Sequence, residues 1–428
     1  MKSTTVLQYR LRLPKTAWDQ ATAARLETAK LWNRMVKLHG WFRKRQMKWP
    51  TCGDFEHHFK GRFTLHSQTI QAIVQKFFAS IDGARTHHQN GNTDARYPKR
   101  LRTHVNVVWK GQSIKVHGNR LALPMGRGRS SISVRLPEIP GGEIAQVELA
   151  FGRLLVTVNR VVADPKPTVG VVAADLGLIH LAVVTDGKES IGVVGRGLRS
   201  LKQGHAKALA SISMLQSRCQ KGSRRWKKLQ ACKRKRARGV QDRTRNLLHH
   251  AANGVIGFCT EKQAGTLVVG DITEMNRGKK KKRSRRLNQE IGLLELGTFV
   301  KYLRYKGNLH GIEIETESEH YTSQTCPACG ARHKPSGRRF ICNTCGYTGV
   351  RDEVGAANLL NRHLNGNIVP NTIVPHGNIR YLRPVALRKP RNVVAPLTPA
   401  TLPAWPGKRF ALYGDDSVAV ASSGIPRL

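Results

Sequence analysis

Acidic residues are scarce in this sequence. Its 428 residues include 27 Asp and Glu against 73 Lys and Arg, which gives a formal net charge of +46 at pH 7. A fold with so much charge of one sign repels itself unless a polyanion neutralises it, and the phosphates of a nucleic acid do this. The composition therefore predicts a nucleic-acid-binding protein.

Long apolar runs are also absent. No stretch of about 18 apolar residues could cross a bilayer, and no hydrophobic segment typical of a signal peptide opens the chain. Four cysteines are scattered without a pairing pattern: Cys52, Cys219, Cys232 and Cys259. This usage is typical of a reducing compartment rather than of a disulfide framework. We expect an intracellular, cytoplasmic protein with no membrane partner, which associates with the nucleoid when it binds DNA.

The N-terminal part combines short strands with two helical segments. Apolar residues alternate over residues 2–13, and short strands separated by Gly and Pro turns follow residue 97. Helical spacing covers residues 16–38, with Gly40 as the predicted stop, and resumes at Ser67. The pattern predicts a small β-barrel of residues 1–15 and 95–167, with residues 16–94 as a helical insertion.

The next segment opens an α/β domain. A buried apolar strand ends in Asp175, turns at Gly177, returns as a second strand and turns again at Asp186-Gly187. This order is typical of an RNase H-like sheet, whose first strand presents its acid to a catalytic metal. We expect the domain to comprise residues 168–325 and 347–364.

A strongly basic helical pair lies within this domain. Residues 196–245 contain 17 Lys and Arg and a single acid, Asp242, at a helical spacing of apolar residues. So few balancing acids favour phosphate binding over a merely solvated face. A second basic run, residues 277–286, is expected to hold RNA or a displaced DNA strand. The predicted nucleic-acid contacts are Arg224, Arg225, Trp226, Lys227, Lys228, Lys233, Arg234, Lys235 and Arg236.

Two CxxC pairs predict a zinc ribbon over residues 326–346. Cys326 and Cys329 precede a short hairpin, and Cys342 and Cys345 follow it. Four thiolates fill the tetrahedral shell of Zn²⁺ and leave no open position, so the predicted zinc is structural.

The order of motifs resembles a known family. AADLGLIHLAVVTDG, VVGD, YTSQTCPACG, CNTCGY and RDEVGAANLL follow one another as in TnpB proteins, which are transposon-encoded RNA-guided DNA endonucleases related to type V CRISPR effectors. The resemblance covers about residues 1–364. It implies a wedge barrel, a recognition insertion and a RuvC nuclease domain that cuts with two Mg²⁺ ions. It also implies a guide RNA like the family's ωRNA, a double-stranded DNA target beside a short target-adjacent motif, and a monomer bound to RNA.

The resemblance implies an Asp–Glu–Asp catalytic set, of which the first and last acids map onto Asp175 and Asp352. The expected Glu after the fourth strand is missing, because that place reads Gly270-Asp271. Asp271 could substitute for it, or the Glu could have moved to Glu319, as in the eukaryotic relatives called Fanzors, or the protein could bind DNA without cutting it. The match of the segment before the first CxxC favours Glu319.

Two other functions compete with an RNA-guided nuclease. The first is a nuclease-dead, RNA-guided DNA-binding repressor. The second is a transposase or resolvase that acts directly on DNA ends, which the lack of a helix-turn-helix pattern disfavours. The proline-rich residues 365–428 show no periodicity and are expected to form a disordered tail.

Overall fold

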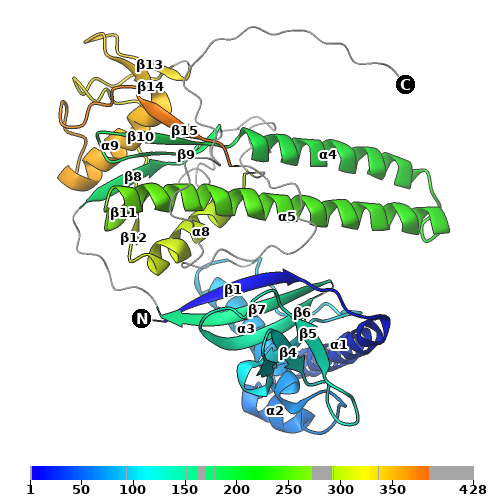
Figure 1. The fold of residues 1–428 in the computed structure, drawn as a ribbon. Helices are drawn as coiled ribbons and strands as arrows, with labels where there is room; N and C mark the ends of the chain where they lie inside the picture. Colours follow the sequence, from blue (N-terminus) through cyan, green and yellow to red (C-terminus); the bar gives the residue numbers. More distant parts are fainter. Residues whose placement is uncertain are drawn as a thin grey trace. The chain divides into compact units, whose positions relative to one another are not determined.

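The computed structural model describes residues 2–92, 94–150, 152–161, 170–177, 179–271, 292, 294–335 and 337–384 (Figure 1). Within these residues the chain divides into two compact units, one up to Val161 and one from Gly170 onward. The basic run 277–286 and residues 385–428 lie outside the described residues. No described helix is both long enough and apolar enough to cross a membrane.

The first unit contains two antiparallel sheets and three helices. One sheet has the order β1-β7-β6-β2, and the other has the order β3-β4-β5. The helices lie in sequence between β1 and β2, which belong to the same sheet. Closure of these strands into a barrel stays a prediction. The elements of this unit are β1 (Lys2–Arg10), α1 (Lys15–Lys44), α2 (Cys52–Phe59), α3 (Ser67–Gln89), β2 (Val107–Lys110), η1 (Gly111–Ser113), β3 (Lys115–His117), β4 (Arg120–Leu123), β5 (Ile132–Arg135), β6 (Glu143–Ala150) and β7 (Arg153–Val161).

Helix α1 continues past Gly40, where the sequence predicts a stop. An isolated glycine costs a helix only about 1 kcal/mol relative to alanine. The buried face of α1, which includes Leu31, Met35 and His39, outweighs that cost. Trp109 is fully buried in the core of this unit, and its Nε1 donates a 2.6 Å hydrogen bond to the carbonyl of Pro124.

The second unit is built on a six-stranded mixed sheet of order β12-β11-β8-β9-β10-β15. β8 pairs in parallel with β11 and antiparallel with β9, and β11 pairs in parallel with β12. Helices α4 and α5 form a long antiparallel hairpin (Figure 1). The elements are β8 (Val171–Asp175), β9 (His180–Thr185), β10 (Ser190–Val194), α4 (Arg196–Ser217), α5 (Arg224–Glu261), β11 (Thr266–Gly270), α8 (Leu296–Leu309), β12 (Glu313–Glu317), β13 (Arg339–Ile341), β14 (Thr348–Val350), α9 (Arg351–Asn365) and β15 (Ile379–Leu382).

Strand alternation decides what each face of this sheet carries. On β8, Val172 and Ala174 join the core formed with α5 and α8, whereas Ala173 packs with Leu359 and Leu360 of α9. Side chains two residues apart share a face, so Asp175 lies on the α9 side. The same alternation places Gly270, at the end of β11, on the side of Val268, which packs with α9.

The segment 366–384 corrects the expectation of a disordered tail from residue 365. It includes β15, which pairs in parallel with β10, and Leu382 of β15 is only 2% exposed in the sheet core. On the way it contacts the cysteine region, where the backbone N–H of Asn371 donates to the carbonyl of Pro327 at 2.8 Å. The sequence did not reveal this strand because it is four residues long and its pairing partner, Ser190–Val193, lies far away in the chain.

Candidate active site and metal centre

Three carboxylates from three separate elements converge beside the end of β8. Asp175 is the last residue of β8, Asp352 lies in the first turn of α9, and Glu319 follows β12 by two residues. Burial raises the pKa of Asp175 well above its ordinary value, and the negative charges of Glu319 and Asp352 raise it further, while Arg351 lowers it. The three acids therefore share one electrostatic environment.

Two glycines make room for these acids. A Cβ added to Gly355 in α9 would lie 3.0 Å from both Cγ and Oδ2 of Asp175. A Cβ added to Gly270 would overlap the Glu319 side chain, with Cγ and Cδ of Glu319 both 2.5 Å away. Glu319 therefore places its carboxyl group in the space where a side chain at the end of β11 would begin.

Asp271 occupies a different position. Its backbone N–H donates to the carbonyl of Glu317 at 2.8 Å, which extends the pairing of β11 with β12 by one residue. The charges that shift the pKa of Asp175, after the larger effect of burial, include those of Glu319, Asp352 and Arg351. Of the two candidates for the middle acid, the structure brings Glu319 to Asp175.

His180 is a site residue that the sequence did not single out. It begins β9, its side chain is largely buried, and its Nδ1 lies 2.8 Å from Oδ2 of Asp352. Its ring lies against that of Tyr381 in β15, with 5.4 Å between the ring centroids. The contact between His180 Nδ1 and Asp352 Oδ2 fixes the orientation of the Asp352 carboxylate. Only the packing of α9 on β9 brings together two residues 172 positions apart, so local sequence carries no signal for it.

The acid set fits a hard divalent cation by its donor chemistry. Mg²⁺ takes oxygen ligands from carboxylates and keeps several of its waters. Among the described residues, the group of possible metal ligands that the structure brings together is that of the four cysteines, whose sulfurs all lie within 4.8 Å of one another. A cation would also offset the repulsion that raises the pKa of Asp175.

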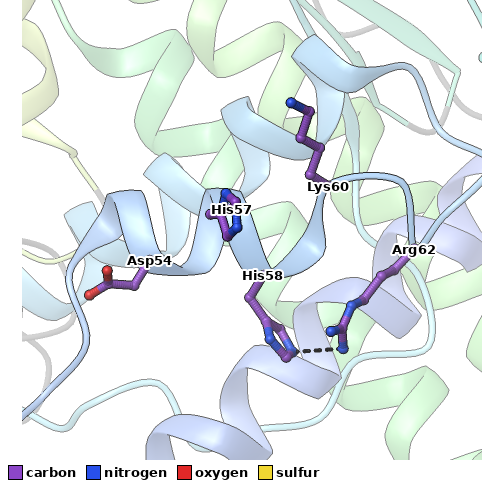
Figure 2. Close-up of a pocket in the computed structure, with 5 residues that line it drawn as sticks. All are labelled: Asp54, His57, His58, Lys60 and Arg62. Carbon is purple, nitrogen blue, oxygen red and sulfur yellow. Dashed lines mark hydrogen bonds between the residues drawn. The ribbon is translucent and has the colours of Figure 1, made fainter.

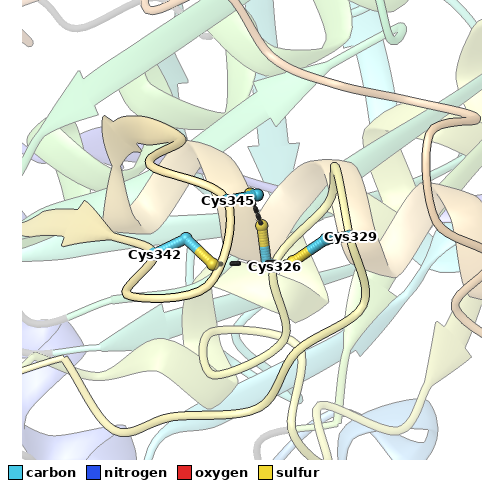
Figure 3. Close-up of side chains that lie close together, drawn as sticks. All are labelled: Cys326, Cys329, Cys342 and Cys345. Carbon is cyan, nitrogen blue, oxygen red and sulfur yellow. Dashed lines mark hydrogen bonds between the residues drawn. The ribbon is translucent and has the colours of Figure 1, made fainter.

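The four cysteines gather into a compact cluster (Figure 3). The sulfurs of Cys326 and Cys345 are 3.7 Å apart, and those of Cys329 and Cys342 are 3.5 Å apart. A tetrahedral site with Zn–S bonds of about 2.3 Å requires sulfurs separated by about 3.8 Å. The cluster therefore fits Zn²⁺ with a closed coordination shell.

Two similar backbone turns build this cluster. After the first CxxC, the N–H of Gly330 donates to the carbonyl of Cys326 at 2.9 Å, and after the second the N–H of Gly346 donates to that of Cys342 at 3.0 Å. Both glycines are left-handed, with φ of +77° and +73°, a conformation that glycine adopts without steric cost. Phe340 of β13 is fully buried beneath the cluster.

The predicted nucleic-acid contacts lie on the N-terminal half of α5. Two of them hydrogen-bond to α4, the other helix of the hairpin: Lys233 donates to Oε1 of Gln216 at 2.6 Å, and Arg236 donates to the carbonyl of Gly204 at 3.3 Å. Trp226 is half-buried near the helix start, where Ser223 caps its N–H. Seven of the basic side chains are exposed: Arg224, Arg225, Lys227, Lys228, Arg234, Lys235 and Arg236.

An open surface hollow on α2 of the first unit has a mostly basic lining (Figure 2). Asp54 of this lining already caps its own helix through Thr51, and His58 contacts Arg62 at 3.2 Å. The remaining lining side chains are His57 and Lys60.

Comparison with known families gives two matches. Residues 297–359 match the model described as "Cas12f1-like, TNB domain". Residues 153–276 match the model OrfB_IS605, described as "Probable transposase". The first match includes Glu319, the cysteines and Asp352, and the second includes Asp175 and Asp271.

Individual relatives agree with these matches. A protein of Mycobacterium tuberculosis named "Putative RNA-guided DNA endonuclease Rv2885c" is 30% identical over 207 residues, which are 47% of this chain and 43% of that protein. The "TnpB-like protein L79" of Acanthamoeba polyphaga mimivirus is 26% identical over 139 residues, which are 32% of this chain and 26% of that protein. The chain thus spans less than half the length of these curated relatives.

A solved structure shares the fold. The protein in a Cas12f1–sgRNA–target DNA complex aligns with a TM-score of 0.56 over 85% of this chain and 99% of its own, at 13% identity. The Fanzor-like position of the glutamate stays a prediction. The two family models and the named relatives confirm that this chain resembles the TnpB family, and its mixed α/β fold resembles that of a Cas12f1 effector.

Proposed function

We propose that this protein is an RNA-guided, Mg²⁺-dependent DNA endonuclease of a transposable element. One observation carries the proposal: Asp175, Glu319 and Asp352 converge from three elements, with Glu319 filling the space at Gly270. The relatives' names and the resemblance to TnpB supply the substrate class, a double-stranded DNA matched to a guide RNA beside a short target-adjacent motif.

The three carboxylates would hold two metal ions. Asp175, Glu319 and Asp352 would be the residues that hold the ions, and Asp175 lies within the electrostatic influence of both other acids. When bound, Mg²⁺ supplies an activated water and stabilises charge on the leaving oxygen of the phosphodiester. Burial and the neighbouring acids raise the pKa of Asp175, and a bound cation would favour its ionised form. His180 keeps Asp352 oriented through the contact at Nδ1. We expect products with a 5′-phosphate and a 3′-hydroxyl, as the family resemblance implies.

The remaining surface would hold nucleic acid. Base pairing with the guide would select the target, and the protein would grip the heteroduplex through its backbone. The exposed cations of α5 suit this role because phosphate contacts need charge rather than base-specific geometry. The four cysteines would hold a structural Zn²⁺ between Glu319 and Asp352 in the sequence.

Purification and cleavage test the proposal. The protein is expressed from its gene together with the flanking DNA. It is expected to copurify with one discrete RNA and, with Mg²⁺, to cut a plasmid matched to that RNA. Glu319→Ala should abolish cutting, and Asp271→Ala should leave it largely intact. A folded protein that emerges free of RNA would refute the RNA-guided function. Cutting by Glu319→Ala together with inactivity of Asp271→Ala would refute the assignment of the middle acid.

A non-cutting, RNA-guided DNA-binding repressor is the second candidate. Gly270 favours it, because the acid that the family places after this strand is missing. Specific binding of a matched plasmid without cleavage, in either Mg²⁺ or Mn²⁺, would establish this alternative.

A further inference from the structure

Arg362 of α9 forms hydrogen bonds to the main chain on both sides of Glu319. Its Nη1 donates to the carbonyl of Ser318 at 2.6 Å, and its Nη2 donates to the carbonyl of His320 at 2.7 Å. A guanidinium presents two parallel donors in a fixed plane, so it fixes both carbonyls at once.

The carbonyl between these two is also held. The backbone N–H and Oγ1 of Thr322 both donate to the carbonyl of Glu319, at 3.2 and 3.0 Å. One helical turn before Arg362, the fully buried Asn358 donates from Nδ2 to the carbonyls of Thr322 and Thr325, at 2.7 and 2.8 Å. Two side chains of α9, Asn358 and Arg362, thus hold the segment 318–325 by hydrogen bonds, and because they are four residues apart they lie on the same face of the helix.

Glu319 needs such support because it lies beyond the sheet. β12 ends at Glu317, so the ladder that orients side chains along a strand does not reach Glu319. Helix α9 is anchored on the sheet by Leu359 and Leu360, and Asp352 lies in its first turn. One rigid helix therefore carries one acid of the set and fixes the main chain of another.

We propose that Arg362 is a positioning residue that aims the Glu319 carboxylate at the metal site. This inference rests on the proposed function, in which Glu319 is a metal ligand. Arg362 bonds the main chain rather than a reacting group, so it acts through the placement of Glu319.

Charge and geometry can be separated by substitution. Arg362→Lys keeps the positive charge but loses the fork that spans two carbonyls, and Arg362→Gln loses both. If Arg362 acted only through its charge, Arg362→Lys would behave like the wild type and Arg362→Gln would bind a cation more tightly. The positioning role predicts weaker binding in both variants. Arg380→Gln is the matched control, since Arg380 pairs with Glu261 elsewhere in the same unit.

The test uses the full chain with its copurified RNA and titrates Mn²⁺, detected by electron paramagnetic resonance. Binding that disappears in Asp175→Asn defines the site. Loss of support for a ligand is expected to weaken site binding about 10-fold in Arg362→Lys and Arg362→Gln. The Mg²⁺ concentration for half-maximal cleavage should rise by a similar factor, with cleavage recovering at high Mg²⁺. Zinc content and the thermal transition report whether each variant is folded.

A double-mutant cycle gives the sharpest outcome. In the Glu319→Gln background, Arg362→Lys should have no further effect on Mn²⁺ affinity. Equal loss in both backgrounds, or wild-type affinity in a folded Arg362→Lys, would overturn the inference while leaving the proposed nuclease intact. If the wild type itself shows no Mn²⁺ binding that depends on Asp175, the proposed function fails instead.

Discussion

The space at Gly270 gives a sharp test of the active site. In the Gly270→Ala variant, the new Cβ would lie 2.5 Å from Cγ and Cδ of Glu319, whereas ordinary contacts begin at 3.4 Å. Oε1 of Glu319 lies nearer still, so the side chain must retreat by more than about 1 Å, and a displacement of that size in a reacting geometry can cost about 100-fold in rate. The clash falls on the movable end of a side chain, so we expect cleavage to drop by about that factor while the fold persists.

The reciprocal exchange of residues tests the same geometry in the other direction. Glu319→Ala should be inactive, and adding Gly270→Glu to it should bring a carboxylate to the same side of the sheet from the end of β11. The double variant is expected to recover measurable cleavage. It fills the space that Glu319 vacates, so the overlap that disables Gly270→Ala is absent.

Plasmid cleavage with the copurified RNA, measured over time at saturating Mg²⁺, is the assay. Gly83→Ala is the control, because a Cβ at this helical position in α3 meets nothing within 4 Å. Cleavage by Gly270→Ala at the wild-type rate would refute the argument from space. Failure of the exchange variant, if it is folded, would show that the position of the acid on the chain matters as well as its place in the site.

Three further predictions concern stability and metal. Cys342→Ser should lose the bound zinc and, because the cluster fixes the chain between two site acids, should also lose cleavage; an active variant with no zinc by elemental analysis would contradict this. Truncation after Gly366 removes β15 and should lower the thermal transition and impair cleavage, because the loss of one buried leucine side chain such as Leu382 alone costs about 2–5 kcal/mol. Truncation after Pro384 keeps β15 and should change neither the thermal transition nor cleavage. Asp175→Asn should stabilise the metal-free protein against urea near neutral pH, since burial and the neighbouring acids raise the pKa of the carboxyl and make its ionisation unfavourable in the folded state. This gain should shrink as the pH falls through about 4, the ordinary pKa of Asp, and vanish below it, where the wild-type carboxyl is protonated in both states; an increase at low pH would contradict it.

Features set by local backbone geometry could be read from the sequence. Each CxxC with a glycine after it specifies a turn in which two thiols face the same point, and the structure places all four sulfurs together. Strand alternation on β8 and on β11 likewise indicates which side chains share a face, because the period of two is local. The basic character of α5 is a matter of composition alone.

The position of the middle acid is a matter of tertiary structure. The motif before the first CxxC favoured Glu319 over Asp271, but nothing local shows which carboxyl group lies near Asp175. The structure places Glu319 in the gap at Gly270, a contact between residues 49 positions apart in the sequence. Three other features also depend on long-range contacts: the pairing of His180 with Asp352, the hydrogen bonds of Arg362, and the pairing of β15 with β10. The sequence wrongly predicted the segment that contains β15 to be disordered.

The sequence alone thus determined the charge of the protein, its cysteine cluster and the two acids that lie within recognisable motifs, since each of these depends on neighbouring residues. Only the tertiary structure shows that Glu319 fills the space at Gly270 and that α9 hydrogen-bonds the main chain beside it. Those outcomes depend on the space and hydrogen bonds between distant segments, which come together only when the sheet and α9 pack.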